Sequence, residues 1–178
     1  HLSVFAFARI PLLILLGFEL DDKVPVELYQ KHRGDVEGWV WPEDGPPEEF
    51  EWNLVREGTS DSKVALILSI SGSVSLGEVP SSLIDAAVFE IRPANSTPNP
   101  NLFRSRATLD AFARCYQDFL SSLEAERGDV ATIHLLPAVP ITAAIATGRH
   151  LMRDVQPEVV VYDKIGTQFE PTLTINQK

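Results

Sequence analysis

Short apolar runs of strand length recur along this chain of 178 residues, separated by polar and turn-forming segments. In several of them apolar side chains alternate with polar ones, and others are apolar throughout, which is typical of half-buried and fully buried strands respectively. These runs predict strands at 2–8, 24–29, 51–57, 63–70, 86–92, 130–136, 158–162 and 169–175.

Helical spacing is clearest in residues 105–127. Apolar side chains recur there every three or four positions, the pattern of a helix with one buried face. That stripe consists of Leu109, Phe112, Ala113, Tyr116, Phe119, Leu120 and Leu123. Gly128 predicts a left-handed stop after this helix, and shorter helices are predicted at 11–20 and 141–153. Strands that alternate with helices indicate an α/β protein with a largely parallel sheet.

Two segments are predicted to lie outside this regular pattern. Residues 34–47 are rich in turn formers and acids, and we expect a surface excursion there. Residues 93–100 hold three prolines and two asparagines, which predicts a loop or the seam between two halves. We therefore divide the chain into a first half, 1–95, and a second half, 96–178, within one domain.

An internal repeat supports two similar halves. Val4 precedes Pro11 by seven residues, as Ile133 precedes Pro140. Each copy continues with the spacings Gly-x-x-Leu and Tyr-x-Lys, the second of which is Tyr29-Gln-Lys31 in one copy and Tyr162-Asp-Lys164 in the other. The repeat predicts two strand–helix–strand units related by an approximate two-fold axis.

Charge limits the class of partner. The formal net charge is −10, which argues against a nucleic-acid polymer, because such a partner needs a basic face. Residues 35–61 alone contribute about −8, so the rest of the chain is close to neutral and can still offer a locally positive pocket to a small anion.

The single cysteine, Cys115, excludes an internal disulfide and leads us to expect a reducing, cytoplasmic compartment. The apolar stretch 10–18 is too short to cross a bilayer and lacks the basic segment of a signal peptide, so we expect no membrane association. The chain opens at His1 rather than at a methionine, from which we expect an effector domain upstream.

The helix beginnings are the predicted ligand site. In each unit a proline follows a strand at the start of a helix, and the free amides there, with the positive end of the helix dipole, favour an anion. Two such beginnings that face one cleft would suit a ring with two or more phosphates. The candidate residues at these beginnings are Arg9, Ile10, Pro11, Pro137, Ala138 and Pro140.

Further candidates come from the segments that follow the strands. Ser71, Gly72 and Ser73 allow close approach of a phosphate to the backbone, although a plain tight turn is the more common reading. Trp39 and Trp41 point the same way in an extended segment. Either a base stacks on one of them, with Trp41 preferred, or both cover the sheet.

Basic side chains complete the set. Arg9 lies between an apolar strand and an apolar helix, so it must be exposed or paired, with a phosphate or with an internal carboxylate. His32 follows the second strand, and Arg104, beside Phe103, flanks the proline-rich seam; both are ligand candidates, with a solvated surface role as the alternative.

Catalytic patterns are scarce. No Cys/His cluster, paired-aspartate motif or phosphate loop of the GxxxxGK type occurs, and we expect neither a metal nor a cofactor. Ser71 lacks a glycine-x-serine-x-glycine elbow. A hydrolase built from Ser71, His134 and Asp163, or a phosphodiesterase that degrades a messenger, therefore stands only as the alternative function.

Several stretches resemble the SAVED domain, the sensor module of CBASS anti-phage effectors. They are residues 11–17, 29–33 with 39–41, 69–72, 134–140, 148–149 and 162–163, which together span nearly the whole chain. The resemblance implies two fused CARF-like, Rossmann-like halves.

The same resemblance implies a function: binding of a cyclic di- or trinucleotide, with a cyclic dinucleotide such as cyclic GMP-AMP favoured by the compact length. It further implies ligand-induced oligomerisation that activates a fused effector such as an HNH DNA endonuclease, and no catalysis by the sensor itself.

Overall fold

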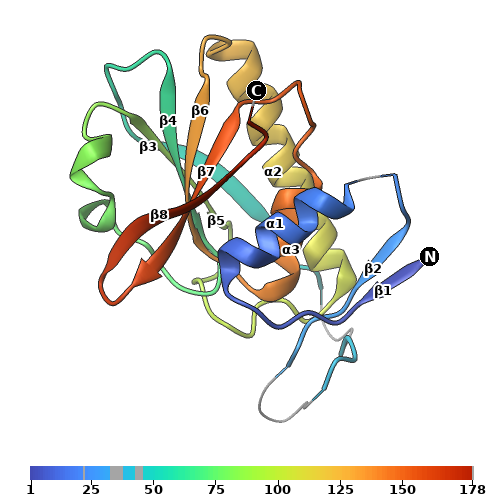
Figure 1. Cartoon of the computed structure of the whole chain (residues 1–178). Coiled ribbons are helices and arrows are strands. Elements are labelled where there is room, and N and C mark those ends of the chain that lie inside the picture. The colour runs from blue at the N-terminus through green and yellow to red at the C-terminus, as the bar shows by residue number, and fades with distance from the viewer. Residues whose placement is uncertain (22, 33–37, 43–45, 178) are drawn as a thin grey trace.

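A computed structural model of the chain describes residues 1–21, 23–32, 38–42 and 46–177 (Figure 1). Its elements, in chain order, are β1 (Leu2–Val4), α1 (Ile10–Leu20), β2 (Val26–Leu28), β3 (Phe50–Arg56), β4 (Lys63–Ser69), the 3-10 helices η1 (Leu76–Glu78) and η2 (Ser81–Leu83), β5 (Ala87–Pro93), α2 (Arg106–Glu126), β6 (Thr132–Ala138), α3 (Ile141–Arg149), β7 (Glu158–Ile165) and β8 (Gln168–Ile175). Half of the predicted 34–47 excursion, residues 34–37 and 43–45, lies outside the described residues.

Six strands form the main sheet in the order β3-β5-β4-β6-β7-β8. The four central strands are parallel, and the edge strands β3 and β8 run antiparallel to their neighbours. The predicted α/β fold with a mostly parallel sheet is confirmed. A separate two-stranded parallel sheet joins β1 to β2.

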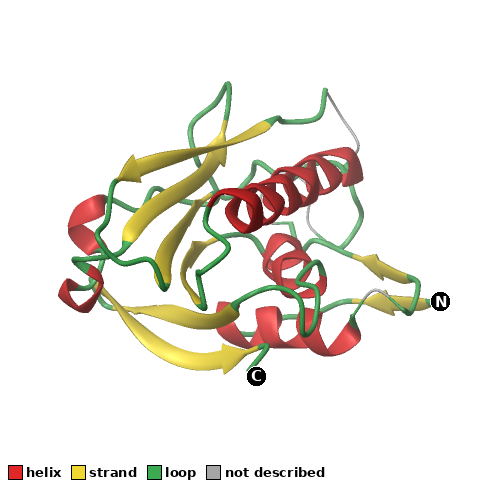
Figure 2. Ribbon diagram, turned by 90° about the horizontal axis from the view of Figure 1, so that it is seen from above, coloured by secondary structure: helices red, strands yellow, loops and turns green. Residues whose placement is uncertain are grey.

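The main sheet is covered on both faces. Figure 2 shows the three α-helices on one side of it and the two 3-10 helices on the other. In β4, Val64, Leu66 and Leu68 join the core under the α-helices, whereas Ala65 and Ile67 join the core under the 3-10 segment. Burial on both faces explains why this strand is apolar at every position from 64 to 68.

Two strand–helix–strand units are present where the repeat predicts them, β1–α1–β2 and β6–α3–β7, and the two strands of each unit are parallel. Their helices pack against each other at the repeated glycine. A Cβ atom on Gly17 would lie 1.9 Å from the Ile145 carbonyl oxygen, and one on Gly148 would lie 1.9 Å from that of Ile14. This reciprocal contact explains the glycine in each copy of the repeat.

The proposed division at residue 95 does not separate two sheets, because β4 of the first half pairs directly with β6 of the second. The division into halves therefore stays a prediction. The strands of the two units belong to separate sheets, and the units pack together through α1 and α3.

Several local predictions were wrong. Gly128 is not among the described glycines with a positive φ; the C-cap of α2 is Arg127, at φ −140° and ψ 54°. The helix predicted at 141–153 ends at Arg149, with His150 as its C-cap. The first strand stops at Val4, because it pairs only with the equally short β2. The 3-10 helices were missed, although Ser75 and Glu78 form a capping box that signals η1.

Candidate ligand-binding site

Helices α1 and α3 both begin at the carboxyl ends of parallel strands. Helix α3 follows β6 after two residues, and Arg9, the N-cap of α1, contacts Asp163 near the carboxyl end of β7. Because β6 and β7 are parallel neighbours, their carboxyl ends meet at one edge of the sheet. Both helix beginnings therefore lie on the same side of the molecule, at the edge where α/β folds bind ligands.

Reciprocal side-chain contacts connect the two units at this edge. The Gln30 Oε1 atom accepts hydrogen bonds from the amide and the hydroxyl of Thr142, at 3.2 and 2.9 Å, in the first turn of α3. The Asp163 Oδ2 atom accepts a hydrogen bond of 2.6 Å from Nε of Arg9. Gln30 and Asp163 are the middle residues of the two Tyr-x-Lys repeats. Equivalent positions of the repeat thus reach the helix beginning of the opposite unit.

These contacts use part of the anion-binding capacity that the sequence suggests. In α1, Pro11 has no amide hydrogen, and the amides of Leu12 and Leu13 both donate to the Arg9 carbonyl, at 3.0 and 3.2 Å. In α3, the Thr142 amide already donates to Gln30. At α1, charged side chains therefore have more capacity for an anion than backbone amides do.

The predicted turn 71–73 lies beside the beginning of α3. The amides of Ile70 and Ser71 donate to the Ala138 carbonyl at 2.9 and 2.8 Å. Ser71 and Gly72 are half-buried and Ser73 is exposed. A Cβ atom on Gly72 would meet nothing within 4 Å, so the turn borders open space. The fold thus brings together two predicted segments that lie almost 70 residues apart in the sequence.

A third group of candidates gathers around Trp41. The rings of His32 and Trp41 meet edge to face at 5.9 Å, and burial together with the nearby Arg104 charge lowers the pKa of His32. The amide of Asn99, in the segment that leads to Arg104, donates to the Ile70 carbonyl. This group therefore adjoins the 71–73 turn.

Two aromatic candidates are part of the core. Trp41 is 5% exposed and its indole donates to the Leu28 carbonyl at 3.0 Å, and Phe103 is 1% exposed. Their burial favours packing over stacking on a base. Trp39 is the more accessible tryptophan of the pair, and its ring contacts Phe5 edge to face at 5.6 Å.

The remaining candidates differ in access to solvent. The Arg9 side chain is 66% exposed. Ile10 and Ala138 are half-buried, whereas Pro11, Pro137 and Pro140 are buried and act through backbone geometry. We call the edge formed by Arg9, Gln30–His32, Ser71–Ser73, Arg104, Ala138 and Asp163 the carboxyl-end rim. Gln30, Lys31 and Asp163 are its additions to the predicted ligand residues, and the matching places of Gln30 and Asp163 in the repeat were the signal for these two.

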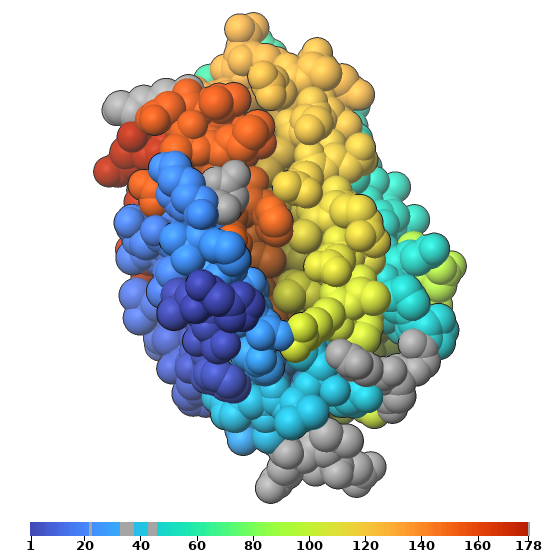
Figure 3. Space-filling view, turned by 90° about the vertical axis from the view of Figure 1, so that its right-hand side faces the viewer, coloured from blue at the N-terminus to red at the C-terminus, as the bar shows by residue number. Residues whose placement is uncertain are grey.

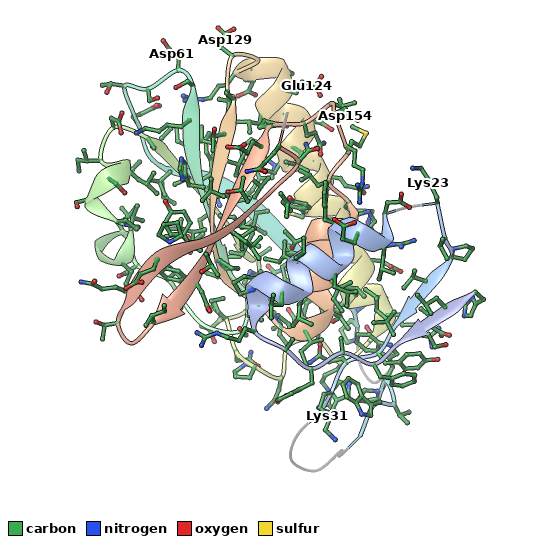
Figure 4. The ribbon with its side chains drawn as sticks, viewed as in Figure 1. Lys23, Lys31, Asp61, Glu124, Asp129 and Asp154 are labelled. Carbon is green, nitrogen blue, oxygen red and sulfur yellow. The ribbon has the colours of Figure 1, made fainter. Side chains whose placement is uncertain are left out.

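The charges of the chain are arranged unevenly around the sheet. Figure 4 shows Asp61, Glu124 and Asp129 at the end of the molecule where β4 and β6 begin, away from Lys31 at the rim. These three acids are thus separated from the rim, so an anion that approaches the rim meets little repulsion from them.

A separate groove of about 440 Å³ lies between β2, α2 and α3, where the N-terminal segment meets α2 (Figure 3). Glu27, Arg106, Asp110 and Arg149 line it, and none of the predicted ligand residues does. It is a distinct surface from the carboxyl-end rim.

The contacts of the hydrolase candidates do not match a catalytic triad. The His134 Nδ1 atom lies 3.1 Å from the Tyr162 hydroxyl, and Asp163 bonds to Arg9. Over the part of the chain that the structure describes, no group of three His, Cys, Asp or Glu side chains is placed to hold a metal ion. Within the same residues, no helix has the length and apolar character to span a bilayer.

Comparisons with known proteins agree with this architecture. Residues 1–175 match the family model described as "SMODS-associated and fused to various effectors sensor domain" (SAVED). No curated protein sequence matches.

Solved structures of Cap4 SAVED/CARF-domain containing receptors are similar in fold. The Acinetobacter baumannii receptor with the cyclic trinucleotide 3'3'3'-cAAA has a TM-score of 0.73 at 15% identity, over 95% of this chain and 37% of that one. Its complex with 2'3'3'-cAAA gives a TM-score of 0.69 at 16% identity, over the same 95% and 37%. The Moraxella osloensis receptor gives 0.61 at 14% identity, over 94% and 35%. The chain thus spans little more than a third of the length of these receptors.

Proposed function

Because the chain belongs to the SAVED family of sensor domains, we propose that it binds a cyclic oligonucleotide second messenger at the carboxyl-end rim. The observation that carries this proposal is the family match over residues 1–175, nearly the whole chain. The ligand is a ring of two or three nucleotides: a cyclic dinucleotide such as cyclic GMP-AMP suits the compact length, and the similar A. baumannii receptor carries a cyclic trinucleotide.

The rim supplies suitable chemistry for such a ring. Arg9, His32 and Arg104 come from three separate segments and place positive or hydrogen-bonding groups along it. Guanidinium groups bind phosphate oxygens through paired, charge-assisted hydrogen bonds. The Ser71–Ser73 turn adds a place where a phosphate can approach the backbone closely.

The domain acts as a cytoplasmic regulator within a longer protein. Ligand binding drives self-association of the sensor, and this activates an attached effector, for which a DNA endonuclease is the expected kind. The sensor binds the messenger without breaking it, and it needs no cofactor. Incubation with a bound messenger, followed by chromatography, is expected to return the intact ring; a linear product would show the alternative enzymatic function.

Thermal unfolding with a panel of cyclic di-, tri- and tetranucleotides tests the proposal. A ligand that binds only the folded state adds RT ln(1 + [L]/Kd), about 2.7 kcal/mol at a hundred times Kd. For a domain of this size that corresponds to a rise in Tm of roughly 5–10 °C. The matched linear oligonucleotides are the control and are expected to give a smaller shift. If no cyclic member of the panel raises the Tm, the proposed function is wrong.

A further inference from the structure

We propose that Asp163 is a positioning residue for the ligand: it holds Arg9 so that the free end of the guanidinium faces a phosphate oxygen. This inference rests on the proposed function for the identity of the ligand. It concerns an aspartate that comes from β7, 154 residues along the chain from the arginine it contacts.

The atoms in contact indicate the role. The hydrogen bond of 2.6 Å runs from Nε of Arg9 to Oδ2 of Asp163. Nε is on the side of the guanidinium nearest the aliphatic stem, so this bond leaves the terminal Nη groups for a second partner. Two Nη donors in one plane match two oxygens of a phosphate.

Exposure of the two side chains differs in the way that positioning requires. The Asp163 side chain is 15% exposed, whereas that of Arg9 is 66% exposed. The carboxylate is thus held within the protein while the guanidinium projects to solvent. An exposed arginine loses much rotamer freedom when it binds a ligand, and an arginine already fixed by a carboxylate loses less.

The repeat places Asp163 in a position that reaches a helix beginning in both units. Its counterpart, Gln30, is buried and bonds to Thr142 at the start of α3. The neutral side-chain amide of Gln30 accepts hydrogen bonds from the Thr142 amide and hydroxyl, whereas the carboxylate of Asp163 engages an exposed cation. The same position of the fold is therefore used to anchor α3 in one unit and to orient Arg9 in the other.

Positioning and simple electrostatics predict opposite results for Asp163→Ala. Removal of a negative charge next to Arg9 should strengthen binding of an anion if charge alone matters. If Asp163 positions Arg9, the variant binds the cyclic oligonucleotide about three- to tenfold more weakly, because the arginine must be ordered at the moment of binding. Asp163→Asn, which keeps an acceptor for Nε, is expected to bind within about twofold of the wild type.

The control is the Arg127–Glu57 pair, in which Nη2 of Arg127 donates to a carboxylate at 3.3 Å, at the end of the molecule where Asp61 and Asp129 lie, opposite the rim. Glu57→Ala is expected to leave ligand affinity unchanged. Nitrogen-15 relaxation of the arginine Nε–H groups, without ligand, should show Arg9 rigid in the wild type and mobile in Asp163→Ala. An Arg9 that is equally mobile in both, or an Asp163→Ala variant that binds the ligand as tightly as the wild type or more tightly, overturns the proposal.

Inorganic pyrophosphate separates this inference from the proposed function. If no cyclic oligonucleotide binds the wild type, the proposed function fails, and the pyrophosphate titration then decides the role of Asp163. A shift of the Arg9 Nε–H resonance in the wild type that needs a several-fold higher pyrophosphate concentration in Asp163→Ala supports positioning. No shift in either protein, or equal affinity in both, refutes it.

Discussion

Substitution of Gly148 by alanine probes the contact on which the pairing of the two units depends. A Cβ atom there would lie 1.9 Å from the Ile14 carbonyl oxygen and 2.7 Å from the Phe18 amide nitrogen. The first distance falls about 1.5 Å short of ordinary van der Waals contact. Because both neighbours are backbone atoms inside α1, no side chain can rotate to make room, and the two helices must move apart.

The expected loss of stability follows from two opposing effects. Overpacking of a tight contact costs up to about 3 kcal/mol, and separation of two helix backbones belongs at the upper end of that range. Alanine returns about 1 kcal/mol, because it is a better helix former than glycine. The net loss of unfolding free energy is therefore about 2 kcal/mol, which lowers the Tm of a domain of this size by roughly 4–8 °C.

Differential scanning calorimetry of Gly148→Ala, Gly17→Ala and the double variant measures this loss. Gly77→Ala is the control, because a Cβ atom at Gly77 would meet only the Ser75 hydroxyl, at 3.7 Å. Either single substitution already separates the helices, so the double variant should lose clearly less than the sum of the two. Wild-type stability of Gly148→Ala, or full additivity in the double variant, would show that the two glycines do not set the distance between α1 and α3.

Two further predictions concern stability. Asn176→Ala should lower the free energy of unfolding, measured in urea, by about 2–4 kcal/mol. The Asn176 side chain accepts a hydrogen bond from the Asp154 amide and donates to the carbonyls of Gln156 and Pro157, and the variant leaves these three backbone groups without that partner. Unchanged stability would contradict this prediction. Burial lowers the pKa of His134 below its usual 6.5, so the unfolded chain binds the proton more readily than the folded one. The free energy of unfolding should therefore fall as the pH drops from 6.5 through the lowered native pKa. His134→Asn should flatten this part of the plot of stability against pH, and an unchanged plot would refute the assignment.

Local sequence patterns predicted the elements well where neighbours in the chain determine them. Helix α2 begins after Ser105, whose hydroxyl accepts a hydrogen bond from the Thr108 amide, and its buried face follows the apolar spacing of the sequence. The sequence shows that a glycine recurs at the same place in both units. Only the structure shows why: at Gly17 and Gly148 the backbones of α1 and α3 are in contact.

Contacts between distant segments could not be predicted in this way. The pairing of Arg9 with Asp163 and of Gln30 with Thr142 joins residues more than 100 positions apart, and no local propensity specifies such a partner. The antiparallel pairing of β3 with β5 is a second case, because β4 lies between them in the sequence. For Trp41, the sequence left stacking and packing equally open, and burial of the ring favours packing.

The central claim is that the messenger binds at the carboxyl-end rim. Two-dimensional NMR of the ¹⁵N-labelled chain, titrated with the cyclic oligonucleotide that raises the Tm most, tests it directly. If the messenger binds at the rim, the largest shifts are expected at the Arg9 Nε–H group and at the backbone amides of Gly72 and Arg104. Shifts confined to Glu27, Asp110 and Arg149, in the groove between β2, α2 and α3, would contradict it.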